Sequence, residues 1–265
     1  MLAIQPGDHI SATFAAEAQF AGNTIRFAEQ AVAASALVMV FPGGPHRSCF
    51  QHRLGASSPV IAGAVRSGQV QIADSRQVQL APGRFDPAYL NEAYAGATRQ
   101  AVDAGFSGLW VSVDMTWAAG VDPDALTDFE AESAGLFTSR ELTAICQYDT
   151  RVFPAKQVAA ACRAHPAGVQ DRSPLRHRRT GRTLRLSGET DLANSLAFAA
   201  LARTLRPGDV LDITAMTFLD VRALATIVRG YTELTGLTIR ASRDQIELLD
   251  LIRAGDGIPS RSDQP

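Results

Sequence analysis

The chain has 265 residues, 46% of them hydrophobic, which is enough to form two globular domains with their own cores. Its formal net charge of −2 argues against a dedicated nucleic-acid-binding protein, because neutralising phosphates requires a broad face of clustered Lys and Arg. No long apolar run and no signal-peptide pattern occurs, so we expect a cytoplasmic protein. The three cysteines lack CxxC spacing, so we expect reduced thiols and neither a zinc site nor disulfides.

Short apolar segments alternate with helix-like segments through the first part of the chain. This alternation predicts an α/β domain built around a largely parallel sheet. Asp86-Pro87 and Asp122-Pro123 each combine a helix N-cap with proline at the first helical position, and Gly105 is expected to end the helix that starts at Pro87. The predicted strands are 36–41, 69–73, 109–113 and 142–146, and the predicted helices are 17–33, 87–104 and 125–136.

A polar stretch at 167–174, bracketed by Pro166, Gly168 and Pro174, is typical of a linker. It divides the chain into domains 1–167 and 168–265. Seven basic residues lie between Arg172 and Arg185 when His177 is included. We interpret them as a linker followed by an edge strand, because charge on an edge strand blocks unwanted pairing.

The second region begins with a predicted hairpin around Gly181 and a strand that includes Leu184 and Leu186. Asp191 is expected to cap the next helix. Pro207-Gly208 then breaks the chain before a second strand, 210–213, which leads into Phe218-Leu219-Asp220. The pattern predicts a small α/β domain.

Motifs in the first region follow one another in a definite order. They are Asp8-His9-Ile10, Gly83-Arg84-Phe85-Asp86, Asp114-Met115-Thr116-Trp117, Phe129-Glu130 and Cys146-Gln147-Tyr148-Asp149. Over residues 7–166 this resembles the MEDS domain, the sensory domain of methanogens, methylotrophs and a dichloromethane-response regulator. That family has Cys and Glu where this chain has Ser11 and Asp114, so we expect no cysteine-dependent role at the first motif.

The MEDS resemblance implies a RecA-like parallel sheet, a fold in which many relatives bind a nucleotide. The corresponding Gly-rich loop would be 42–48, but a phosphate-binding loop needs a Lys after its glycines and this segment has none. A tight turn is therefore the favoured interpretation. Neither a catalytic pairing nor a cofactor is predicted, so we do not expect an enzyme.

Ligand sites in open α/β sheets lie at the carboxyl ends of the strands. If the strands at 109–113 and 142–146 are neighbours, the polar and aromatic residues that follow them converge on one rim that suits a small polar or amphipathic ligand. In the alternative interpretation, the aromatic residues cap the core, Asp149 pairs with Arg151, and His9 is structural rather than a metal ligand. The candidate ligand-binding residues are His9, Asp114, Trp117, Gln147, Tyr148 and Asp149.

The Gly188-Glu189-x-Asp191-Leu192 and Thr217-Phe218-Leu219-Asp220 elements resemble the STAS domain of sulfate-transporter tails and anti-sigma-factor antagonists, from Ser173 to about Gly255. The resemblance implies a protein-docking surface at the loop and helix start after the second strand. Val221 replaces the usual phosphoacceptor and Ala223 the usual glycine, so the phosphorylation switch is expected to be absent. The implied partner-binding residues are Asp191, Asn194, Thr217, Asp220, Val221, Arg222 and Leu224.

These docking residues also have a simpler interpretation, in which Phe218, Leu219 and Leu224 belong to the core and Asp220 only caps a helix. We therefore carry three hypotheses. The first is a bacterial signalling regulator of transcription that binds an anti-sigma factor or a related kinase-like protein, with a possible small-molecule ligand and without direct contact to nucleic acid or membrane. The second is a nucleotide-binding protein or enzyme that uses the RecA-like domain, and the third is an adaptor that has lost both sensing and switching.

Overall fold

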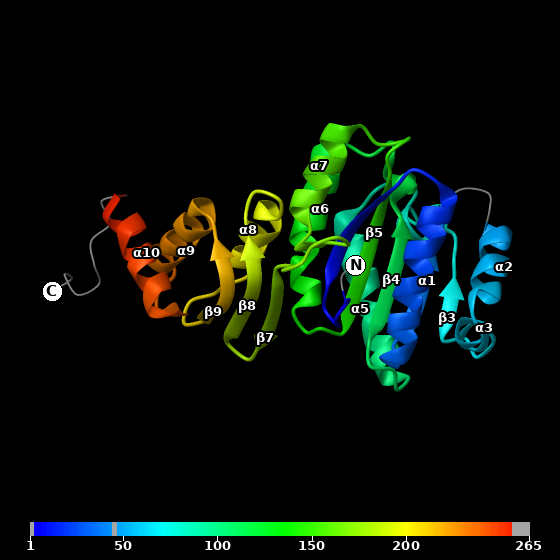
Figure 1. The fold of residues 1–265 in the computed structure, drawn as a ribbon, viewed down its shortest axis with the longest axis horizontal. Coiled ribbons are helices and arrows are strands. Elements are labelled where there is room, and N and C mark those ends of the chain that lie inside the picture. The colour runs from blue at the N-terminus through cyan, green and yellow to red at the C-terminus, as the bar shows by residue number, and fades with distance from the viewer. Residues whose placement is uncertain (1–2, 44–46, 256–265) are drawn as a thin grey trace.

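The computed structural model describes residues 3–43 and 47–255, which form two packed α/β units (Figure 1). The first unit contains a six-stranded, all-parallel sheet in the order β3-β2-β4-β5-β1-β6. This is the parallel α/β architecture that the sequence predicts. Its strands are β1 (His9–Phe14), β2 (Leu37–Phe41), β3 (Val70–Ile72), β4 (Leu109–Asp114), β5 (Leu142–Asp149) and β6 (Ala167–Gly168).

Helices cover both faces of this sheet, because the strands alternate their side chains between the two faces. Along β4, Trp110 packs with the helices of one face, whereas Val111 and Val113 pack on the other. The first face carries α1 (Glu17–Ala33), α2 (Arg47–Ser57) and α3 (Pro59–Arg66). The other elements are α4 (Ser75–Gln79), α5 (Pro87–Asp103), η1 (Met115–Ala118), α6 (Pro123–Glu132), η2 (Ser133–Phe137) and α7 (Ala155–Ala164).

The predicted helix starts are confirmed in the first unit. Asp86 accepts a hydrogen bond from the Tyr89 amide at 3.0 Å, and Asp122 accepts one from the Asp124 amide at 2.8 Å. The four predicted strands are present, but the strands β1 and β6 and the helices α2, α3, α4 and α7 were not predicted. β1 lies between β5 and β6 and is almost entirely buried, so its sequence lacks the alternation of polar and apolar residues that marks a half-exposed strand.

The predicted linker begins inside the first sheet, since β6 pairs with β1 through Ile10 opposite Ala167 and Ser11 opposite Gly168. A two-residue strand carries too little pattern to be recognised in the sequence. The chain then enters the second unit, whose four-stranded sheet has the order β10-β9-β8-β7. Its elements are β7 (Arg176–Thr180), β8 (Thr183–Thr190), α8 (Ser195–Arg203), β9 (Val210–Leu219), α9 (Val221–Glu233), β10 (Thr238–Arg240) and α10 (Arg243–Gly255).

The second unit confirms the predicted hairpin and edge strand. β7 and β8 are antiparallel and joined through Gly181, whose φ of 56° lies in the left-handed region that glycine adopts at low cost. β7 is the outer strand of its sheet and carries most of the basic residues of the 172–185 stretch. The remaining strand pairs are parallel, and α8, α9 and α10 contribute to one core with the sheet.

One helix start differs from the prediction. Asp191 does not cap α8, because that helix begins at Ser195 with Asn194 as its N-cap residue. The Asp191 carboxylate instead accepts a hydrogen bond from the Ala193 amide at 2.7 Å in the preceding turn. The Asn194 side chain holds this turn by accepting from the Asp191 amide and the Thr190 hydroxyl. At α9 the prediction is confirmed, because Asp220 accepts from the Ala223 amide at 2.8 Å.

The two units share a packed interface (Figure 1). Ala131, Ala134 and Ala164 of the first unit lie in the same buried cluster as Phe198 of α8. Beside this cluster the Arg176 guanidinium donates two hydrogen bonds, at 2.9 and 3.0 Å, to the buried Asp8 carboxylate. Because Asp8 directly precedes β1 and Arg176 begins β7, this ion pair connects the two sheets. Among the described residues, no helix combines the length and apolar character that a bilayer-spanning segment needs.

Replacing Arg176 with Ala is expected to destabilise the protein, because the buried Asp8 carboxylate then loses its guanidinium partner. We expect the free energy of unfolding to fall by about 2 kcal/mol and the melting temperature by about 5 °C. The matched control is Arg178→Ala, since Arg178 is exposed on the same strand. Calorimetry or urea unfolding measures the effect, and equal stability of the two variants would contradict a structural role for the Asp8–Arg176 pair.

Candidate ligand site at the carboxyl edge of the parallel sheet

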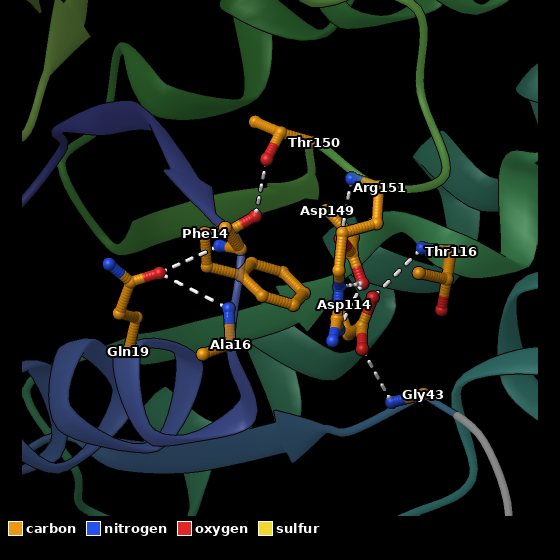
Figure 2. A network of polar contacts seen from close by, with 10 residues as sticks. Phe14, Ala16, Gln19, Gly43, Asp114, Thr116, Asp149, Thr150 and Arg151 are labelled. Carbon is orange, nitrogen blue, oxygen red and sulfur yellow. Dashed lines mark hydrogen bonds and ion pairs between the residues drawn. The ribbon is translucent and has the colours of Figure 1, made fainter.

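Four parallel strands of the first sheet end at one edge, and their last residues and following loops converge there. Phe14 at the end of β1 is opposite Asp149 at the end of β5, and Asp114 at the end of β4 is opposite Gln147. The loop after β2 contributes Gly43, whose amide reaches Asp114. Figure 2 shows the Asp114 and Asp149 side chains pointing into the same space between these strand ends.

These residues line a pocket of about 200 Å³. Three phenylalanines form its apolar wall, with ring centroids 5.4 Å apart for Phe14 and Phe20 and 5.3 Å apart for Phe20 and Phe50. Among the described lining residues, three carboxyl groups face two guanidinium groups, which favours a cationic ligand over an anionic one. The charged lining residues are Glu17, Arg53, Asp114, Asp149 and Arg151.

Among the described residues, backbone amides donate hydrogen bonds to the Asp114 carboxylate. It accepts hydrogen bonds from the Thr116 amide at 2.9 Å and from the Gly43 amide at 3.1 Å (Figure 2). A Cβ atom at Gly43 would overlap the Asp114 carboxylate and the Thr116 hydroxyl, so this close approach requires glycine. Burial raises the pKa of Asp114, and the neighbouring Asp149 adds a smaller effect in the same direction, against the lowering by these hydrogen bonds.

Asp149 is in the opposite electrostatic situation. The Arg151 guanidinium donates to both carboxylate oxygens, at 2.9 Å from Nε to Oδ1 and 2.6 Å from Nη2 to Oδ2. These hydrogen bonds lower the pKa of Asp149. The pocket therefore holds two carboxyl groups whose pKa values are shifted in opposite directions. A positive group placed between them would offset the electrostatic cost of burying the charged form of Asp114.

The start of α1 borders the same pocket but offers no phosphate-binding loop. The Gln19 side chain accepts hydrogen bonds from the Ala15 and Ala16 amides, at 2.7 and 3.2 Å, so these amides at the helix start are already engaged (Figure 2). The segment at 42–48, proposed from the sequence as the nucleotide-loop equivalent, includes residues 44–46, which lie outside the described residues. Among the described lining residues of the pocket there is no Lys.

Of the six candidate ligand residues, only Asp114 and Asp149 line this pocket. Gln147 points under α1, where its amide nitrogen donates to Thr24 at 3.0 Å and to Ser112 at 3.1 Å. Its carbonyl oxygen accepts from Asn23 at 3.1 Å. The side chain is therefore fully occupied in holding α1 on the sheet.

His9, Trp117 and Tyr148 lie on the opposite face of the sheet. The Tyr148 hydroxyl donates to Glu130 Oε1 at 2.8 Å, and His9 Nε2 is 3.3 Å from Glu130 Oε2. His9 and Trp117 line a separate, mainly apolar cavity of about 40 Å³. The expected single rim thus divides in two, because consecutive residues of a strand point to opposite faces: Tyr148 points to one face, and Gln147 to the other.

The structure also contains a buried group that the sequence did not identify as a site. It consists of His9, Glu130, Cys146 and His165. Its four members are too far apart in the sequence to form a short metal-binding motif such as CxxC or HxxxH. At the edge pocket the sequence placed Gly43 in the candidate nucleotide loop but missed its contact with Asp114, and it missed the three phenylalanines. Only the glycine that follows a buried strand offered a signal, because such a glycine often marks a close backbone approach.

The predicted docking residues occupy two segments: 217–224, across the end of β9 and the start of α9, and the turn before α8. Thr217, Val221, Arg222 and Asp191 are exposed, and Asp220 is half-buried as the cap of α9. Leu224 lies in the core and the Asn194 side chain is occupied by hydrogen bonds, so neither is free to contact a partner. This corrects their assignment to the contact surface.

Large apolar side chains lie exposed in the same two segments of the second unit. Val221 is 66% exposed, Leu192 57% and Phe218 51%. Single exposed apolar side chains are normal at a protein surface, whereas several that lie together form a candidate contact surface. Of these three residues, only Val221 is among the docking residues predicted from the sequence.

Comparison with known proteins identifies one family. A family model described as the methanogen/methylotroph, DcmR sensory domain (MEDS) matches residues 8–166. This range includes β1 to α7 and therefore the edge pocket and the buried group around Glu130. No curated protein matches the chain.

Replacing Arg151 with Met is expected to raise the pKa of the Asp149 carboxyl, because its hydrogen-bonded guanidinium is lost. A carboxyl whose folded pKa is lowered stabilises the folded state above its unfolded pKa, near 3.8, and this stabilisation is lost as the pH falls through the lower folded pKa. The variant should therefore lose the part of the acid sensitivity that comes from Asp149.

Carboxyl NMR titration, together with urea unfolding at neutral and acid pH, measures both effects. Arg53→Met is the control, because Arg53 lines the same pocket but lies 3.9 Å from Glu17. An unchanged Asp149 titration in the Arg151 variant would refute the assigned cause of the shift.

Proposed function

The chain belongs to the MEDS family, and from this premise we propose that it is a cytoplasmic signalling regulator with a ligand-binding amino-terminal domain and a partner-binding carboxy-terminal domain. The observation that carries the proposal is the family match over residues 8–166, because a sensory domain requires a ligand site and the edge pocket lies within this range. Its position at the carboxyl ends of parallel strands is the usual place for a ligand in this class of sheet.

The ligand that best fits the edge pocket is a small organic cation that carries methyl or methylene groups. The excess of carboxyl groups among the described lining residues supplies electrostatic attraction, and the described hydrogen-bond partners of Asp114 are uncharged groups. The rings of Phe14, Phe20 and Phe50 supply apolar area and negative ring faces, which attract alkylammonium groups. Arg151 would keep Asp149 in its charged, oriented form.

The proposed output is protein docking at the start of α9, as in the antagonist proteins that the second unit resembles in its Gly-Glu-x-Asp-Leu and Thr-Phe-Leu-Asp motifs. The proposed partner is an anti-sigma factor or a related kinase-like regulator. Exposed Phe218, Val221 and Leu192 support a contact surface of mixed character, with Arg222 beside them. Because Val221 has no hydroxyl group, binding would not be switched by phosphorylation at this position.

Ligand binding and docking would be coupled through β1. Phe14, at one end of this strand, lines the edge pocket, and Asp8, just before its other end, forms the ion pair with Arg176 of the second unit. A ligand can shift the docking surface only if it binds two arrangements of the domains with different affinities. The alternative, a nucleotide-binding protein or enzyme, is supported only by the two carboxyl groups with oppositely shifted pKa values.

The ligand proposal is tested by calorimetric titration of the full chain with choline and with its neutral isostere 3,3-dimethylbutan-1-ol. We expect choline to bind at least about tenfold more tightly, because only the cation gains the attraction of the carboxylates and rings. Asp114→Asn should remove this preference, since the amide side chain carries no charge. Its single oxygen can accept from only one of the Gly43 and Thr116 amides, so the fold of the variant is checked by circular dichroism.

The matched control for the ligand is Asp128→Asn, an exposed carboxylate on α6, which should behave like the unaltered protein. Equal affinities for the cation and its isostere, or no binding of either, would refute the proposed ligand class.

The docking proposal is tested by cross-linking and capture from the native cell with the full chain. We expect a kinase-like anti-sigma factor to be recovered by the unaltered protein and lost with Val221→Asp or Arg222→Glu, because both changes place negative charge on the proposed contact surface. Asp at the first position of a helix is compatible with folding. The control is Arg229→Glu, an exposed site further along α9. Equal recovery by all variants would place the docking surface elsewhere.

A further inference from the structure

A group of four potential metal ligands is buried on the face of the first sheet opposite the ligand pocket. The exposed fractions of His9, Glu130, Cys146 and His165 are 2%, 2%, 6% and 1%. They come from β1, α6, β5 and the residue after α7, and one ligand atom of each lies within 4.8 Å of all the others. The signalling function proposed above makes no use of this group.

Four of the six distances between the ligand atoms are close to the edges of a tetrahedron around a zinc-like ion. Glu130 Oε2 is 3.3 Å from His9 Nε2 and 3.4 Å from His165 Nε2. Cys146 Sγ is 3.6 Å from His9 Nε2 and 3.8 Å from Glu130 Oε2. Metal bonds of about 2.0 Å to nitrogen or oxygen and about 2.3 Å to sulfur give tetrahedral edges of about 3.3 and about 3.5 Å. These four distances already fit one ion, and the remaining two, from His165 to His9 and to Cys146, are at most 4.8 Å.

The hydrogen bonding of His165 leaves a lone pair facing this space. Its Nδ1 lies 2.8 Å from the Ala161 carbonyl oxygen, which can only accept, so Nδ1 carries the proton. In the neutral ring Nε2 is then an acceptor, has no hydrogen-bond partner, and lies 3.4 Å from a carboxylate oxygen. Two electron-rich atoms at this distance repel each other unless a cation lies between them. A backbone carbonyl holding Nδ1–H is also the arrangement that orients a metal-binding histidine.

Charge balance points in the same direction. The ion pairs of Glu130 among the described residues are formed with His9 and His165, and no Lys or Arg takes part in them. A buried carboxylate without a permanent cation is costly. A divalent ion bound by this carboxylate, a Cys146 thiolate and two neutral imidazoles forms a centre with no net charge. Binding would release the thiol proton to the solvent.

We propose that His9, Glu130, Cys146 and His165 form a closed, tetrahedral site for a divalent transition metal of the zinc class. Sulfur and imidazole ligands select such an ion over magnesium or calcium, and four protein ligands leave no open position for a substrate. The site is therefore structural or regulatory rather than catalytic. Metal binding connects β1 and β5 to α6 and α7.

The site also lies beside the interface between the two units. Ala131 and Ala164 are the sequence neighbours of Glu130 and His165, and both belong to the buried cluster that contains Phe198 of α8. Loading the site should therefore stabilise the packing of the second unit against the first, as well as the first unit itself.

The test begins with the full chain, stripped with a chelator and titrated with Co²⁺ and then Zn²⁺. We expect one Co²⁺ per chain, with the intense visible bands of tetrahedral Co²⁺ and a thiolate charge-transfer band that Zn²⁺ removes by displacement. Zn²⁺ should also raise the melting temperature, because it binds only the folded state. A folded chain that shows neither tetrahedral bands nor stoichiometric metal would overturn the proposal and leave a hydrogen-bonded polar cluster.

Cys146→Ser is expected to abolish the charge-transfer band and to weaken Zn²⁺ binding by at least about a hundredfold, because a metal–thiolate bond is lost. The matched control is Cys162→Ser, since Cys162 lies on α7 outside the group and should bind like the unaltered protein. If Cys162→Ser, and not Cys146→Ser, removed the band, the assignment of the ligands would be wrong. A ligand variant that does not fold leaves the cobalt spectrum of the unaltered chain as the deciding measurement.

Discussion

The pairing of β1 with β5 is the constraint on which the rest of this structure depends. The parallel register places Phe14 opposite Asp149 at the carboxyl edge and brings His9 within reach of Cys146. On its other side, β1 pairs with β6, where the chain turns toward the second unit, and Asp8 just before β1 holds Arg176. One short strand therefore contributes to the edge pocket, the buried four-residue group and the domain interface.

The alternation of side chains along β5 keeps these sites separate. Cys146 and Tyr148 point to the face covered by α6 and α7, and Gln147 points to α1. Asp149 ends the strand at the pocket, where Arg151 lowers its pKa, while burial raises that of Asp114 on the neighbouring strand. A chain segment of four residues thus serves a ligand pocket, a packing contact and a buried polar group without overlap.

The elements that hold the buried group also hold the second unit. α6 supplies Glu130, and His165 directly follows the end of α7. Alanines of the same two helices pack against α8. Small side chains at such a contact let helices approach closely, so a shift of α6 or α7 would be transmitted to α8 rather than absorbed. The pocket, by contrast, reaches the second unit through β1 and the Asp8–Arg176 pair. The proposed ligand and the proposed metal would therefore reach the proposed docking surface through different contacts.

The sequence by itself determined those features that depend on neighbouring residues. The strand-helix alternation, the caps at Asp86, Asp122 and Asp220, and the hairpin at Gly181 all follow from local backbone preferences. It failed at Asp191. There the Asn194 side chain bonds the local turn, through the Asp191 amide and the Glu189 carbonyl, and also donates to the carbonyl oxygen of Pro166, which is distant in the sequence. The sequence also could not assign side chains to faces.

Only the tertiary structure brought His9, Glu130, Cys146 and His165 together, because strand order and register, rather than spacing along the chain, decide which distant residues meet.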